Sequence, residues 1–195
     1  MDEVNFLDVS AVLGLCAAAL LTVNMLLGML LSTTYKRAPL WQKLPAPIKQ
    51  LNVNRIHNWS AYVALSLVVL HIVFLLLNKA TKFTITDVLL PINAPHQKLQ
   101  VALGTIALYA IITVIITTQK SVRKKMGFRL WKNLHLISYG TALLFILHGI
   151  LLDPELKDRP VDWLDGEKLV PEFCGIVLIV ASVIRWRHWR KRRKG

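Results

Sequence analysis

Four of the six histidines in this 195-residue sequence form two spaced pairs that could bind metal ions. His57 and His71 are 14 positions apart, and His135 and His148 are 13 positions apart. At a rise of about 1.5 Å per residue, either interval extends roughly 20 Å along an α-helix. Neutral imidazole is a good ligand for iron and other transition metals. The sequence therefore predicts metal ligands at two levels of each helix.

Long apolar segments surround both pairs. Hydrophobic residues make up 54% of the chain and gather in five blocks with few charges. Blocks of about 20 residues cross a bilayer as helices, because lipid cannot satisfy the hydrogen bonds of open backbone. We expect an all-α, polytopic bundle of five spans, formed as a single domain over residues 1–195. The expected spans cover residues 6–31, 58–77, 99–118, 130–152 and 170–186.

The charged residues predict how these helices cross the membrane. The sequence has 24 basic and 11 acidic residues, which gives a net charge of +13. Segments 36–55, 120–132 and 185–194 carry 18 of the basic residues and no acidic residue. Cytoplasmic loops are enriched in Lys and Arg, so these segments are expected in the cytoplasm. The N-terminus then lies outside and the C-terminus inside, in a multi-pass protein of the inner (cytoplasmic) membrane.

A membrane also explains the excess of basic charge better than nucleic acid does. The basic tail at residues 187–195, which includes His188, is expected to contact anionic lipid headgroups, with Trp186 and Trp189 at the interface. Docking of an acidic cytoplasmic electron donor is the alternative for this tail. No nucleic-acid partner is expected.

The predicted topology pairs the histidines across two parallel helices. Both helices run from the cytoplasm outward, so His57 would face His135 near the inner surface and His71 would face His148 near the outer surface. Two imidazoles on facing helices can hold one haem between them. We therefore expect two haem b groups, each with two axial histidines on its iron. An iron with six ligands has no open position, which favours electron transfer.

The 13-residue interval in the fourth span does not fit an ideal helix. At about 100° per residue, 14 residues return to within about 40° of the starting face, whereas 13 residues fall about 140° short. This span is expected to be overwound, tilted or locally irregular. Gly140 and Gly149 offer places for such an adjustment.

Weaker candidates lie near the inner histidines. Trp59 and Trp131 could pack on the inner haem, although anchoring at the membrane interface is the simpler explanation for each. Arg55, Arg123 and Arg129 could pair with the haem propionates, or act only as cytoplasmic charges.

Other residues with ligand chemistry have simpler explanations. Met25 and Met29 in the first span are expected to pack against the core or lipid. Cys16 and Cys174 are too few for a disulfide framework or a thiolate metal site. His96 lies in a loop expected outside, where it could contact the outer haem or an external substrate.

Two segments of the sequence resemble the ferric reductase-like transmembrane domain. They are RIHNWSAYVALSLVVLHIVF, with the first histidine pair, and LWKNLHLISYGTALLFILHGIL, with the second. The resemblance covers residues 31–152 and implies two haems, with His57 paired to His135 and His71 to His148. That superfamily includes ferric-chelate reductases, NADPH oxidases and the haem subunit of periplasmic methionine sulfoxide reductase. Membership implies electron movement from the cytoplasmic face to an acceptor outside.

The sequence departs from the two-haem oxidases and reductases in ways that concern the electron donor. Those proteins usually have six spans and a cytoplasmic flavin and nicotinamide domain, whereas five spans and no Gly-rich dinucleotide motif are found here. The donor is expected to be a separate flavoprotein, a ferredoxin-like protein or membrane quinol, so that any flavin or quinone comes from a partner. An acidic segment, 153–172, could dock a cationic redox partner outside the cytoplasm, although an exposed, solvated loop is the simpler explanation.

Four functions remain open on the sequence alone, the last of them a haem-free assembly protein. The first is transmembrane electron transfer through two haems, as the membrane component of an oxidoreductase, to ferric chelate, oxygen or a periplasmic partner. The second is a quinol-oxidising subunit of a periplasmic reductase such as methionine sulfoxide reductase. The third is a non-redox proton or metal transporter that uses the intramembrane histidines. Two separated histidine levels and spans without buried carboxylates argue against the transporter.

Overall fold

All regular structure is helical in the part of the chain that the structure describes. This computed structural model describes residues 5–153, 155–157, 166 and 168–194. Five helical stretches are long and apolar enough to cross a membrane, which confirms the five predicted spans. The stretches are α1 (Phe6–Leu31), α4 (Val53–Leu77), α6 (Lys98–Thr118), α8 followed by α9 (Phe128–His135 and Ile137–Leu151), and α10 (Leu169–Lys194).

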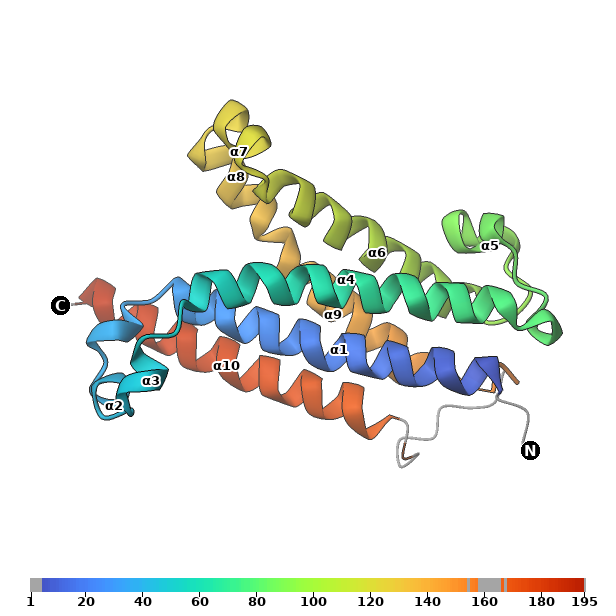
Figure 1. The fold of residues 1–195 in the computed structure, drawn as a ribbon, viewed down its shortest axis with the longest axis horizontal. Helices are drawn as coiled ribbons and strands as arrows, with labels where there is room; N and C mark the ends of the chain where they lie inside the picture. The colour runs from blue at the N-terminus through green and yellow to red at the C-terminus, as the bar shows by residue number, and fades with distance from the viewer. Residues whose placement is uncertain (1–4, 154, 158–165, 167, 195) are drawn as a thin grey trace.

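Short helices connect the long ones at both ends of the bundle. The helices α2 (Pro39–Gln42), α3 (Ala46–Lys49) and α7 (Lys120–Met126) lie toward the end that holds the C-terminus, and α5 (Ile85–Leu89) lies at the opposite end (Figure 1). Single 3₁₀ turns complete the connections at Tyr35–Arg37, Lys79–Thr81 and Pro91–Asn93. The end with α2, α3, α7, α8 and the last turns of α10 is called the basic end below.

Asparagine caps set where two of the spans begin. The Asn5 side-chain oxygen accepts a hydrogen bond of 3.0 Å from the Leu7 backbone N–H at the start of α1. The Asn52 side-chain oxygen accepts one of 3.0 Å from the Arg55 N–H at the start of α4. Because the cap precedes the apolar run, α4 begins at Val53 and carries His57 already inside its helical part.

The long helices pack side by side, and α1 contacts α4, α9 and α10. The most extensive contact joins α1 to α4, the next joins α6 to α9, and α10 lies against α1 and α9 (Figure 1). One buried cluster consists of Met29, Ala142 and Leu178, from α1, α9 and α10. Met25 packs against this cluster, so the packing role predicted for both methionines is confirmed.

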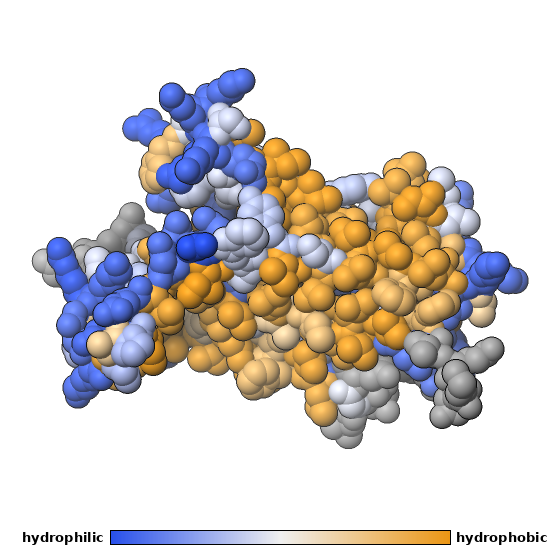
Figure 2. All heavy atoms as spheres, viewed as in Figure 1, coloured by the Kyte–Doolittle hydropathy of each residue, from blue (hydrophilic) through white to orange (hydrophobic). Residues whose placement is uncertain are grey.

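The surface has an apolar band between two polar ends. Figure 2 shows hydrophobic residues over the middle of the bundle and hydrophilic residues gathered at the basic end. Large apolar side chains such as Val63, Ile106 and Ile179 are exposed on the helices. An apolar surface this extensive is typical of a face that contacts lipid. The chain is therefore a multi-pass membrane protein.

The fourth span is broken at Leu136, directly after His135. The Leu136 N–H lies 3.1 Å from the Lys132 carbonyl and 3.2 Å from that of Asn133, and the Tyr139 N–H donates to the Leu136 carbonyl over 3.1 Å. Bonds between residues three apart tighten a helix toward about 120° per residue. This local overwinding recovers part of the rotation that the 13-residue interval lacks, so the irregularity expected in this span lies at Leu136.

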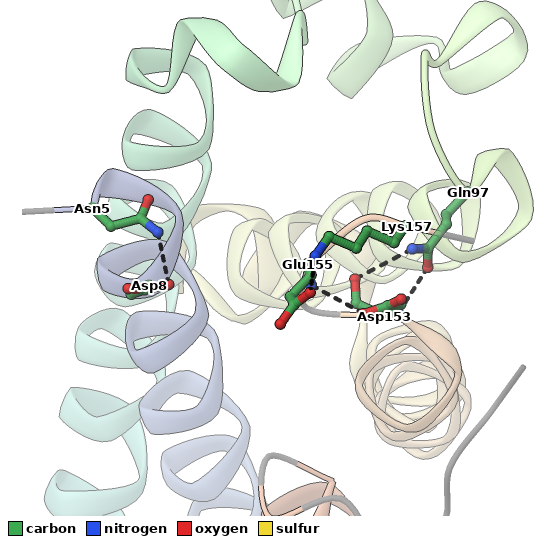
Figure 3. A network of polar contacts seen from close by, with 6 residues as sticks. All are labelled: Asn5, Asp8, Gln97, Asp153, Glu155 and Lys157. Atoms are coloured by element: carbon green, nitrogen blue, oxygen red, sulfur yellow. Dashed lines mark hydrogen bonds and ion pairs between the residues drawn. The ribbon is translucent and has the colours of Figure 1, made fainter. Parts of the chain in front are cut away.

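A buried amide holds α6 and the end of α9 in register. The Gln97 side chain donates to the Asp153 carbonyl over 3.2 Å and accepts from the Asp153 N–H over 2.8 Å (Figure 3). Both residues are buried. Gln97 pays a conformational cost for this contact, because its φ of 46° is in the left-handed region. The contact links the first turn of α6 to the segment that follows His148.

Candidate functional site

The structure brings the four histidines of the spans together as two facing pairs. The ring centroids of His57 and His135 are 6.2 Å apart, and those of His71 and His148 are 6.4 Å apart. Each pair joins α4 to the fourth span, at two levels of the bundle. These are the partners that the sequence predicted.

His71 is held by a polar contact with α1. Its ring nitrogen Nδ1 lies 2.7 Å from the backbone carbonyl oxygen of Ser10. The Ser10 hydroxyl donates in return to the His71 carbonyl over 2.9 Å. Gly14 lies one turn further along α1 and faces the imidazole ring.

His57 repeats this arrangement one level away on the same two helices. Its Nδ1 lies 3.0 Å from the carbonyl oxygen of Asn24, and the Asn24 amide donates back to the His57 carbonyl. Gly28 faces the ring. Ser10 and Asn24 are 14 positions apart, as are Gly14 and Gly28. The repeat on α1 therefore matches the 14-residue histidine interval on the antiparallel α4.

His148 is held in the same way by α6. Its Nδ1 lies 2.8 Å from the carbonyl oxygen of Gln100, and Gly104 faces the ring. In all three cases the accepting carbonyl belongs to a polar residue, and a glycine follows four positions later. We call each such carbonyl and glycine a histidine cradle.

The cradles determine which ring nitrogen is available to bind a metal ion. A carbonyl oxygen can only accept, so Nδ1 of His57, His71 and His148 must carry the proton. The lone pair is then on Nε2, which can bind a metal ion. A hydrogen bond from Nδ1–H also fixes the ring orientation and increases the basicity of the ligand nitrogen.

The glycines give the rings room to approach the carbonyls. A Cβ at Gly104 would lie 2.9 Å from Cε1 of His148, and a Cβ at Gly14 or Gly28 would lie 3.1 Å from a ring atom of its histidine. Carbon atoms in normal contact are about 3.5–4.0 Å apart. Any larger residue would therefore displace the imidazole. Gly140, which lies on α9, has no such neighbour within 4 Å.

His135 has a different environment at the basic end. Its ring stacks on that of Trp131, with centroids 5.3 Å apart and planes 20° apart. The guanidinium carbon of Arg123 lies 4.1 Å from the centre of the Trp131 ring. Among the described residues, the His135 Nδ1 is buried without a hydrogen-bond partner.

The other sequence candidates are not brought to the histidine pairs. Arg55 and Arg129 are exposed, and Trp59 is 61% exposed and packs edge-on against Tyr62. His96 lies near Phe83 in the connection that follows α5. Of the five residues proposed to surround the inner haem, Trp131 contacts a histidine directly and Arg123 lies over Trp131.

The site suits a flat group with a central metal better than a bare ion. No cluster of three or more His, Cys, Asp or Glu side chains is found in the described chain, so each pair alone offers two ligands. With a bond of about 2 Å from metal to imidazole nitrogen, two rings on opposite sides of one metal ion have centroids roughly 6 Å apart. Both pairs have this separation. The His71–His148 pair also lines an apolar cavity of about 190 Å³ between α1, α4, α6 and α9.

Sequence reasoning missed the cradles, although they leave a signal. The pattern is a polar residue followed four positions later by glycine: SAVLG at 10–14, NMLLG at 24–28 and QVALG at 100–104. Polar residues are costly within an apolar span unless a neighbouring helix satisfies them. Ser10 and Asn24, buried at the level of the two histidines on α4, are explained in this way.

Comparison with known proteins identifies the family. The model of the family described as ferric reductase like transmembrane component matches residues 13–148. This range contains both histidine pairs and all three cradle glycines. Neither the curated proteins nor the solved structures include a match to this chain. The chain belongs to the family of ferric reductase-like transmembrane components.

Proposed function

We propose that this protein carries electrons across the membrane through two haem b groups. His57 and His135 would hold one haem, and His71 and His148 the other. The observation that carries the proposal is that four imidazoles face each other in two pairs, one pair at each level. Three of the four have Nδ1 fixed by a backbone carbonyl. Haem would supply the one-electron chemistry, as its iron alternates between ferrous and ferric states.

The protein's own residues would position the two groups and protect them. The cradles place the proton of three imidazoles on Nδ1, which leaves Nε2 deprotonated. The same hydrogen bonds hold each ring against the backbone of a neighbouring helix. Two histidines for each iron would leave no position for a further ligand, and the apolar side chains of the bundle would exclude water. On α4 the two histidines are separated by about 21 Å of helix, at 1.5 Å per residue. The two levels would thus divide the bilayer into shorter electron-transfer steps.

The direction of transfer is proposed from the charge pattern. If the basic end lies in the cytoplasm, the His57–His135 pair is the entry level and the His71–His148 pair is the exit level. The donor would be a separate cytoplasmic flavoprotein or membrane quinol. The acceptor would be a ferric chelate, oxygen or a redox protein on the other side.

Proteoliposomes test this function directly. Vesicles are loaded with ferricyanide, which does not cross lipid, and dithionite is added outside. We expect the internal ferricyanide to bleach with the wild-type protein and to bleach only at the protein-free rate with His71→Ala, which breaks the path at one level. Equal bleaching by wild type and His71→Ala would argue against the proposed path.

A further inference from the structure

A shallow groove runs between α1 and α4, on the outside of the bundle. It has a volume of about 370 Å³, and the residues that line it are Leu20 of α1 and Arg55, Ile56, Trp59, Ser60 and Val63 of α4. At 100° per residue, the centre of this stripe on α4 lies about 130° round the helix from His57. The groove therefore faces away from the histidine pairs, on the surface that contacts lipid.

The side chains along this groove change from charged to apolar as α4 enters the membrane. Arg55 is in the first turn of α4, at the basic end (Figure 1), Trp59 follows one turn later and Val63 two turns later. The eight positions from Arg55 to Val63 cover about 12 Å at 1.5 Å per residue, most of the roughly 15 Å of hydrocarbon in one leaflet. A phospholipid has the same order of groups, with its phosphate outermost, then its esters and then its acyl chains.

The polar end of the groove carries donors that an external group can reach. Arg55 is exposed and Trp59 is 61% exposed. Among the described residues, neither side chain makes an ion pair or a hydrogen bond. The first turn of α4 has no acidic residue to balance Arg55. An anionic oxygen would complement the Arg55 guanidinium in a charge-assisted hydrogen bond.

The floor of the groove is fixed by hydrogen bonds between α1 and α4. The Ser60 hydroxyl accepts from the Asn24 amide over 2.8 Å and donates to the His57 carbonyl over 3.1 Å. Leu20 lies one turn before Asn24 on α1 and forms the opposite wall. Because these contacts hold the two helices together, the groove is already formed before anything binds, which lowers the cost of binding.

We propose that this groove is a binding site for one anionic phospholipid. The Arg55 guanidinium would bind the phosphate, and the Trp59 indole N–H would donate to a phosphate or ester oxygen. One acyl chain would lie along the apolar walls at Leu20 and Val63. An anionic headgroup fits better than a neutral one, because segment 36–55 carries five basic residues and no acidic residue. The site does not depend on haem.

A lipid titration followed by native mass spectrometry tests the site. The protein is stripped of lipid in maltoside and titrated with phosphatidylglycerol, and the first bound lipid gives the dissociation constant. We expect Arg55→Gln to weaken this binding roughly tenfold, the low end for a lost hydrogen bond to a charged group, because Arg55 is exposed. Val63→Trp keeps the charge but fills the groove, so it should weaken binding as well. Phosphatidylcholine, whose headgroup has no net charge, should bind the wild type less tightly.

Matched controls separate the groove from general attraction to basic residues and from added bulk. Arg129→Gln removes another exposed charge at the basic end, and Val73→Trp enlarges an exposed position of α4 outside the groove. Both should bind phosphatidylglycerol as tightly as the wild type. Equal affinity of the wild type, Arg55→Gln and Val63→Trp would overturn the site. Weaker binding by Arg55→Gln but not by Val63→Trp would overturn the groove as the binding site of the acyl chain, and an equal loss in Arg129→Gln would overturn the role of Arg55.

Discussion

Replacing Gly104 with alanine is predicted to weaken haem binding at the His71–His148 pair alone. The new Cβ would lie 2.9 Å from Cε1 and 3.0 Å from Nδ1 of His148. Because contacting atoms need about 3.5 Å, the imidazole would have to withdraw by roughly 0.5 Å. That movement opposes the 2.8 Å hydrogen bond from Nδ1 to the Gln100 carbonyl, so the cradle and the ring could not both keep their places.

The size of the effect follows from the cost of overpacking. An added methyl group in a packed interior typically costs about 1–3 kcal/mol. Since about 1.4 kcal/mol changes an equilibrium constant tenfold, the affinity for haem at this pair should fall roughly 5- to 150-fold. The His57–His135 pair should be unaffected, because Gly28 rather than Gly104 faces His57.

The assay is the ratio of haem to protein after purification, measured as the pyridine haemochrome. We expect the ratio to fall from two toward one in Gly104→Ala. Gly140→Ala is the matched control, because a Cβ at Gly140 meets no atom within 4 Å. Two haems and an unchanged spectrum in Gly104→Ala would refute the reasoning, and so would an equal loss in Gly140→Ala.

Three further predictions concern the same bundle. His71→Ala should leave one haem per chain, and retention of two would exclude His71 as a ligand. Gly28→Ala, with a Cβ 3.1 Å from the His57 ring, should lower haem occupancy at the His57–His135 pair. The loss should be seen in the part of the α band that Gly104→Ala leaves unchanged. Gln97→Ala removes two buried hydrogen bonds to Asp153 and should cost about 1–3 kcal/mol of stability. A fluorescence melt that matches the wild type would contradict that estimate.

The helices and the histidine pairs could be predicted because each leaves a local signal. Apolar length predicts a span, and paired histidines at about one bilayer leaflet apart predict facing ligands once the charges make their helices parallel. The position of the break at Leu136 could not be predicted. No glycine or proline marks it in the sequence, and Gly140 lies four residues further along the chain.

The partners of the histidines were harder to predict, because they depend on contacts between helices. Ser10 and Gly14 are 57 or more positions from His71 in the sequence, and nothing local links them. The helix that supplies the acceptor is known only once α1 is seen against α4. Trp131 shows the same difficulty, since an interfacial tryptophan and one stacked on a buried histidine have the same sequence context.

The visible spectrum of the purified protein tests the central claim most directly. Protein expressed with ample haem should show a Soret band and an α band on reduction, with two haem b per chain. The His57–His135 and His71–His148 pairs should each account for one of them. A folded, monodisperse preparation with neither band would contradict haem binding altogether, and a single haem per chain would contradict the two-level path.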